Sequence, residues 1–142
     1  MISTTNIEQA KKLIKTEQKP IIVKAQDDNF NRKILEYGKF EILLSPDRGN
    51  KTDNLRQIDS GLNRVLADIA SRKGIAIGFD FQEIESLEKK EKAKRLSRIR
   101  QNIKISRKSK TKIKSFNYKD KKDAQALLLS LGASTQQASE AF

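Results

Sequence analysis

The sequence lacks three residue types that carry much of the chemistry of known protein sites. Its 142 residues include no cysteine, no histidine and no tryptophan. Without cysteine the chain forms no disulfide and no thiolate metal site. Without histidine it forms no Ser-His-Asp triad, no Cys-His pair and no imidazole metal ligand. These absences exclude several of the most frequent designs of active site.

Long apolar runs are also absent from the sequence. The longest runs, such as Leu127–Leu129, are far shorter than the roughly 18–20 residues that span a bilayer. Met1 is not followed by a basic patch, an apolar core and a cleavage site of small residues, so we expect no secretory signal. The sequence therefore predicts a soluble protein of the cytoplasm that has no membrane partner.

What the sequence has in excess is positive charge, and that charge is concentrated. The chain carries 30 lysines and arginines against 18 acidic residues, a net charge of +12. Residues 1–88 and residues 115–142 are each electrically neutral, so the whole excess lies in residues 89–114. A basic segment on a neutral body favours a docking surface for the phosphates of a polyanion. The alternative is a solvated, lysine-rich stretch without a ligand.

Apolar spacing and turn residues predict helices that alternate with short strands. We expect helices near residues 6–18, 27–37, 60–73, 87–100, 123–131 and 135–142, and strands at residues 21–23, 40–44, 75–79 and 103–105. This alternation favours right-handed βαβ units and a parallel sheet. The predicted fold class is α/β, an incomplete TIM-barrel-like (βα) repeat with about four parallel strands. We expect residues 1–142 to form this single partial barrel, with the basic segment 89–114 inside it.

Three stretches of the chain resemble a known family. Residues 59–81 read DSGLNRVLADIASRKGIAIGFDF, residues 37–49 read YGKFEILLSPDRG, and the C-terminal part contains KDKKDAQALLLSLGASTQQASEA. The first stretch is similar to the central block of the archaeal ribonuclease P protein component 3 family, whose eukaryotic relative is the 30-kilodalton subunit. The second resembles the family's strand that ends in Ser-Pro before a basic loop. The third resembles its Arg-x-Pro-Arg-Asp segment and the helix that follows.

The resemblance covers roughly Pro20 to the C-terminus and includes two departures. Lys119 and Lys121 stand where the family has arginine and proline. The exchange of arginine for lysine keeps the charge but loses the bidentate fork of the guanidinium. Set against the family's barrel, the chain begins near the third strand. The resemblance therefore implies a chain that is shortened at its N-terminus by about two strand–helix units.

The family resemblance implies a function in tRNA processing. It implies a non-catalytic protein subunit of ribonuclease P, the ribonucleoprotein enzyme that removes the 5′ leader from precursor tRNA. The RNA subunit would carry the chemistry with Mg²⁺, and this chain would bind no cofactor of its own. The implied partners are the ribonuclease P RNA, a Pop5-type protein subunit and the other ribonuclease P proteins.

Two regions contain the candidate RNA-binding residues. In the basic segment these are Arg95, Arg98, Arg100, Arg107, Lys108 and Lys110. Arg48 and Lys51 lie in the long loop that follows the second predicted strand. In βα folds ligands bind at the carboxyl ends of the strands, where this loop begins. We predict no catalytic and no metal-binding residue in the chain.

Two other functions stay open at this point. One is a metal-dependent hydrolase on a degenerate barrel, in which an acidic patch would bind Mg²⁺ or act as a paired acid and base. Its candidate residues are Asp80, Glu83, Glu85 and Glu88, although the same carboxylates also suit the N-terminal end of a helix. The other is a basic protein that binds any polyanion without selectivity.

Overall fold

The computed structural model describes residues 1–49 and 58–142. In this part of the chain four strands form one all-parallel sheet in the order β1-β2-β3-β4. The strands are β1 (Ile22–Lys24), β2 (Ile42–Leu44), β3 (Ala76–Asp80) and β4 (Ile113–Phe116). The helices are α1 (Ile7–Thr16), α2 (Asp28–Tyr37), α3 (Arg64–Lys73), α4 (Phe81–Glu85), α5 (Lys89–Ser109), α6 (Lys121–Ser130) and α7 (Thr135–Glu140). The prediction of an α/β fold with a four-stranded parallel sheet is confirmed.

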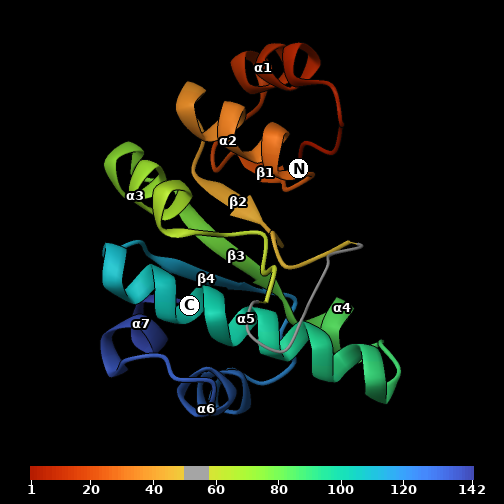
Figure 1. Ribbon diagram of the computed structural model, residues 1–142, viewed down its shortest axis with the longest axis vertical. Helices are drawn as coiled ribbons and strands as arrows, with labels where there is room; N and C mark the ends of the chain where they lie inside the picture. Colours follow the sequence, from red (N-terminus) through yellow and green to blue (C-terminus); the bar gives the residue numbers. More distant parts are fainter. Residues whose placement is uncertain (50–57) are drawn as a thin grey trace.

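The elements follow one another through space in nearly the order of the chain. Figure 1 shows α1 and α2 at one end of the molecule, α3 and α5 along its middle, and α6 and α7 at the other end. Each strand pairs only with its sequence neighbours in the sheet, which is the arrangement of consecutive βα units in a barrel. The chain therefore forms an arc of such units.

One residue from each strand shares a register and lies in the core. These residues are Val23, Leu43, Ile77 and Ile113. All four are at most 1% exposed and belong to the same cluster as apolar residues of the helices. Burying a side chain of this size stabilises the fold by roughly 1.5–3 kcal/mol. The core thus lies between the sheet and the helices that connect its strands.

Gly78 lies on the other face of the sheet, where side chains crowd together. A Cβ atom added to Gly78 would lie 3.0 Å from side-chain atoms of Ile42, Leu44 and Phe116. Three side chains therefore lie over this glycine. The glycine is required because those side chains from β2 and β4 meet above β3.

Each outer edge of the sheet is partly covered by residues near a chain terminus. At β1, the backbone N–H of Ile2 donates to the Ile22 oxygen at 2.8 Å, and the N–H of Lys24 donates to the Ile2 oxygen at 2.9 Å. At β4, the N–H of Ser115 donates to the Ala141 oxygen at 2.9 Å. Such contacts reduce the number of free backbone groups on which another strand could pair.

The predicted fourth strand at residues 103–105 is wrong. These residues belong to α5, which continues to Ser109, and the fourth strand is Ile113–Phe116. The alternation Ile-Lys-Ile imitates a strand locally, but Ile99 and Ile103 are four residues apart and both lie in the core, as a helix requires. Tertiary packing therefore overrides the local pattern.

Candidate nucleic-acid interface

Helix α5 is the element that carries most of the concentrated charge. It contains 21 residues, a length of about 32 Å. Ten of these residues are lysine or arginine and one, Glu91, is acidic. The helix ends at Lys110, whose φ of 58° and ψ of 33° are left-handed. Because side chains leave a helix in all directions, this charge is divided between an inner and an outer face.

On the inner face, Arg95 forms a buried ion pair. Its Nε lies 2.7 Å from Oδ2 of Asp47, and its Nη1 lies 3.1 Å from Oε1 of Glu83. Arg95 is only 6% exposed and Asp47 only 1%. Asp47 directly follows Ser45 and Pro46 at the end of β2. The pair therefore ties α5 to the start of the connection between β2 and α3.

Arg98 strengthens this attachment through the backbone. Its Nη1 donates to the carbonyl oxygens of Asp47 and Gly49, both at 3.3 Å. Like Arg95, it is 6% exposed. Hydrogen bonds from a charged donor are stronger than those between neutral groups. Arg95 and Arg98 together hold residues 45–49 against the helix.

The end of the same connection is also held by α5. The amide Nε2 of Gln101 donates to the Ile58 oxygen at 2.9 Å, and Nδ2 of Asn102 donates to the Ser60 oxygen at 3.0 Å. Asn102 and Ser60 are both buried. The inner face of α5 therefore fixes both described sides of the β2–α3 connection.

Burial changes the proton affinities of the pair. The loss of hydration raises the pKa of Asp47 above its ordinary value, because it outweighs the attraction of Arg95. Burial by itself lowers the pKa of Arg95, but the carboxylates of Asp47 and Glu83 raise it further than burial lowers it. A raised pKa favours the charged form of Arg95, which faces two carboxylates. It disfavours the charged form of Asp47, which faces one guanidinium and a second acid.

The outer face of α5 presents cations to solvent. Arg100, Lys104, Arg107 and Lys108 are all exposed. They occupy positions i, i+4, i+7 and i+8, which share one side of a helix. Within residues 1–49 and 58–142, no acidic side chain forms an ion pair with any of the four. This row, called the outer basic row below, is a surface on which phosphates could replace water.

A groove of about 620 Å³ runs beside the outer basic row. All four cations of the row line it, together with Ile58, Ser97, Gln101, Ile105, Leu131 and Gly132. No acidic residue is among these lining residues. The groove lies between α5 and the connection from α6 to α7. The charged side chains among its described lining residues are therefore all basic.

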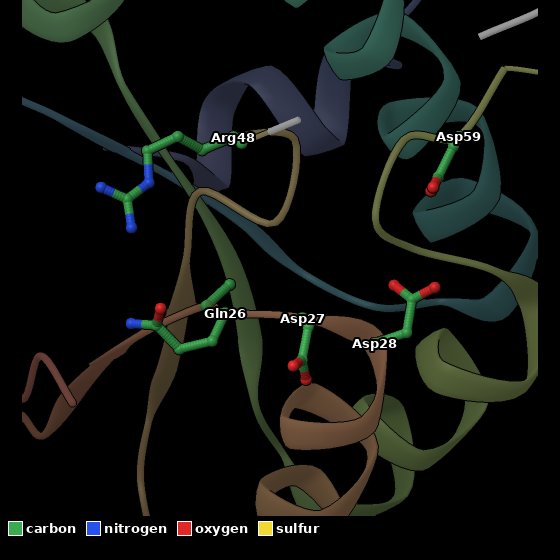
Figure 2. A pocket seen from close by; sticks show the side chains of 7 residues that line it. Gln26, Asp27, Asp28, Arg48 and Asp59 are labelled. Carbon is green, nitrogen blue, oxygen red and sulfur yellow. The ribbon is translucent and has the colours of Figure 1, made fainter. Parts of the chain in front are cut away.

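The loop residue Arg48 lies in a different environment. It is partly exposed and lines a pocket of about 460 Å³ with Asp27, Asp28 and Asp59. Figure 2 shows Asp28 and Asp59 pointing toward each other and the guanidinium of Arg48 turned away from both. Three carboxylates repel phosphate, so this pocket suits RNA less well than the groove beside α5. Lys51, the other predicted loop residue, lies outside the described residues.

The predicted RNA-binding residues of the basic segment are divided by their burial. Arg100, Arg107 and Lys108 lie together in the outer basic row, and Lys110 is exposed at the end of the helix. Arg95 and Arg98 face inward. Their low exposure favours a structural role, and their contact with phosphate stays a prediction.

The sequence analysis missed Lys104. Residues 103–105 were predicted to form a strand, whereas the structure places Lys104 in α5. The signal was present in the spacing: Arg100, Lys104 and Lys108 recur every fourth residue. The structure places Lys104 in the middle of the outer basic row.

Three residues of the acidic patch, Asp80, Glu83 and Glu85, form contacts within the protein. Oδ1 of Asp80 accepts the backbone N–H of Glu83 at 3.1 Å at the start of α4, and Oδ2 of Asp80 accepts Nδ2 of Asn117 at 3.1 Å. Glu85 lies 3.5 Å from Nζ of Lys119. Among the residues that the structure describes, no group of three or more His, Cys, Asp or Glu side chains is arranged to bind a metal ion. No described helix is long and apolar enough to cross a membrane.

Comparison with known proteins identifies relatives by sequence. No family model matches the chain. Ribonuclease P protein component 3 from Methanococcus maripaludis strain S2 is 27% identical over 115 residues, which are 79% of this chain and 47% of the relative. The protein of the same name from strain C6 is 28% identical with the same coverage. The chain therefore spans about half the length of the curated relatives it matches.

A solved structure has the same fold. A chain in a cryo-EM structure of archaeal ribonuclease P with mature tRNA superposes with a TM-score of 0.78 at 24% identity. The match covers 98% of this chain and 61% of that chain. The fold therefore agrees with the relationship found by sequence. The sequence comparison confirms the predicted resemblance: the chain is similar to ribonuclease P protein component 3.

Proposed function

We propose that this chain acts as a protein subunit of ribonuclease P, binds its RNA and supports removal of the 5′ leader from precursor tRNA. The observation that carries the proposal is the outer basic row, four exposed cations that pair with no acid among the described residues, on a helix of a chain that is similar to ribonuclease P protein component 3. The similarity to these relatives indicates the enzyme, and the outer basic row provides a surface that fits its RNA.

The physical basis of the contact is the exchange of counterions. Each phosphate that meets a lysine or arginine releases condensed cations, so the affinity falls steeply as salt rises. Arg100 and Arg107 can donate two parallel hydrogen bonds to phosphate oxygens, while Lys104 and Lys108 act as point charges. The inner face of α5 is fixed to the β2–α3 connection, so the outer basic row is held on a rigid support.

The remaining parts of the proposal follow from the family. The chain is non-catalytic by itself, and the ribonuclease P holoenzyme is the endonuclease. Mg²⁺ is held by the RNA subunit, and this chain binds no cofactor. A Pop5-type protein and the other ribonuclease P proteins are its protein partners, and the particle works in the cytoplasm.

Reconstitution of the particle tests this function. The chain is combined with the ribonuclease P RNA and the other protein subunits, and 5′ leader removal is measured at low Mg²⁺. A variant with glutamate at Arg100, Lys104, Arg107 and Lys108 is expected to lose most of the stimulation. The matched control places glutamate at four exposed lysines elsewhere, Lys12, Lys19, Lys33 and Lys122. It changes the net charge equally and is expected to keep the stimulation.

Several outcomes would overturn the proposal. Equal loss in the outer-row variant and the control would show that only net charge matters. Equal displacement of the chain from the RNA by heparin and by bulk tRNA would indicate binding to any polyanion. Leader removal by the protein without RNA, together with bound metal in the purified chain, would indicate a hydrolase.

A further inference from the structure

The groove beside the outer basic row has aliphatic walls as well as cations. Ile58 precedes α3, Ile105 belongs to α5 and Leu131 follows α6, so three segments distant in sequence contribute to it. Each of these three side chains is partly exposed. Binding to a regular phosphate backbone requires no aliphatic surface. Apolar surface rimmed by polar groups marks a place where a ligand is bound.

The wall opposite α5 leaves space for a ligand. Gly132 has a φ of 103°, and a Cβ atom built on it would meet nothing within 4 Å. The groove volume of about 620 Å³ lies in the range of about 300–1,000 Å³ that is usual for small-molecule sites. The space is thus sufficient for a group with the size of a nucleobase, with the cations at its margin.

We propose that this groove receives the base of an unpaired nucleotide while the outer basic row binds the phosphates on either side of it. The inference rests on the proposed function, because the RNA is the polyanion that the row is taken to bind. The charge of the lining selects a polyanion, since the lining residues that the structure describes include four cations and no acid. The aliphatic walls select a polyanion that can offer an apolar face.

Regular double-stranded RNA does not offer such a face to side chains. Its bases are stacked, its major groove is deep and narrow, and its minor groove displays hydroxyls and base edges. Bases become accessible in bulges, loops and ends. The groove therefore favours RNA with an unpaired nucleotide over a continuous duplex.

The hydroxyl of Ser97 and the amide nitrogen of Gln101 already have partners within the protein. Oγ of Ser97 donates to the Ala93 oxygen at 3.1 Å. Nε2 of Gln101 donates to the Ile58 oxygen and to Oγ of Ser60. Contacts between a base and aliphatic side chains do not depend on the identity of the base. We therefore expect a preference for an unpaired nucleotide with little preference for its sequence.

Binding of two matched RNAs to the full chain tests the inference. One RNA is a continuous duplex and the other is the same duplex with a single bulged nucleotide, and affinities are measured by fluorescence anisotropy at physiological salt. The chain is expected to bind the bulged RNA about fivefold more tightly. Leu131→Ser and Ile105→Ala are each expected to bring the bulged RNA close to the affinity of the duplex. Ile105→Ala keeps a strong helix former in α5 and therefore guards against misfolding.

The control variant is Leu129→Ser. Leu129 is 46% exposed on α6, two residues before Leu131, and does not line the groove. It is expected to retain the fivefold preference.

Equal binding of both RNAs by the unmodified chain would overturn the inference and leave the proposed function standing, as would a preference that survives Leu131→Ser and Ile105→Ala. Failure to bind either RNA would overturn both. Displacement of the bulged RNA by an acidic, leucine-containing peptide more readily than by heparin would indicate a protein occupant instead.

Discussion

The two faces of α5 carry the same basic residue types in opposite environments. On the inner face, Arg95 and Arg98 are 6% exposed and bind Asp47, Glu83 and backbone carbonyls. On the outer face, Arg100 and Arg107 are exposed and have no acidic partner in the described part of the chain. Positive charge in this segment is therefore divided between an inner set that holds the fold and an outer set that is exposed to solvent.

The difference between the faces is one of solvation. A buried charge has lost its water, so it depends on its partner, and removal of that partner is costly. An exposed charge keeps its water and contributes little to stability, but it is free to exchange water for phosphate. The comparison predicts that variants on the inner face change folding first, and that variants on the outer face change RNA binding first.

The largest effect is expected from Arg95→Met. This change leaves the Asp47 carboxylate buried without a cation, which costs about 3–5 kcal/mol of unfolding free energy. Urea denaturation monitored by circular dichroism measures the loss. Arg64→Met is the control, because Arg64 pairs with Asp68 at 3.1 Å on the surface, and exposed pairs of this kind contribute at most about 1 kcal/mol. Similar losses in the two variants would contradict the division between the faces.

A smaller effect, confined to binding, is expected from neutralising the outer face. Arg100→Gln, Lys104→Gln and Lys108→Gln in one chain remove three of the four cations of the outer basic row. The slope of log affinity against log salt is expected to decrease by about 0.7–0.9 per lost contact. The unfolding free energy is expected to change by no more than about 0.5 kcal/mol per site. An unchanged salt slope would show that the row does not touch the RNA backbone.

The next effect in size is a dependence of stability on pH that arises from Asp47, the buried partner of the inner face. Asp47 has a pKa raised above 3.8, its ordinary value. The folded chain therefore holds a proton between 3.8 and the raised pKa that the unfolded chain has released. The contribution of Asp47 to stability is present below 3.8 and is lost as the pH rises through the folded pKa.

Asp47→Asn isolates this dependence. Asparagine resembles the protonated acid and does not titrate, so the unmodified chain is expected to lose stability relative to Asp47→Asn as the pH rises through this window. Denaturation by urea at a series of pH values measures the gap. Lys104→Gln, on the outer face, serves as the control and is expected to follow the unmodified chain. A difference in unfolding free energy between the two chains that does not change with pH, or that shifts in favour of the unmodified chain as the pH rises, would contradict the cause assigned to the shift.

The sequence predicted the first three strands because their signals are local. Each is an apolar run near a residue that stops the preceding helix: Pro20, Gly38 and Gly74. The fourth strand was misplaced because the inner face of α5 is largely polar. Asn102 and Ser106 are fully buried there, so the apolar stripe that marks a helix is interrupted. The apolar spacing therefore did not show this part of the helix, because polar residues that contact distant parts of the chain occupy its buried positions.

The same limit applies to the candidate site. Charge counting located the basic segment correctly, because composition is a property of the sequence alone. It did not separate Arg95 from Arg100, because the partner of Arg95 is Asp47, 48 residues earlier in the chain. Which arginine faces inward depends on the packing of α5 against the β2–α3 connection, and no local pattern encodes that contact.

The smallest effect concerns Lys110, where folding and binding are expected to respond in opposite directions. Its φ of 58° places a residue with a Cβ atom in the left-handed region, which glycine adopts without strain. Lys110→Gly is therefore expected to raise the unfolding free energy by about 0.5–1 kcal/mol. It also removes one cation, so the salt slope of RNA binding should fall by no more than about 0.7–0.9.

Lys112→Gly is the matched control, because Lys112 is exposed and is not among the described residues with a positive φ. It removes the same charge without relieving strain and is expected to lower stability, so equal destabilisation by the two glycines would contradict the prediction.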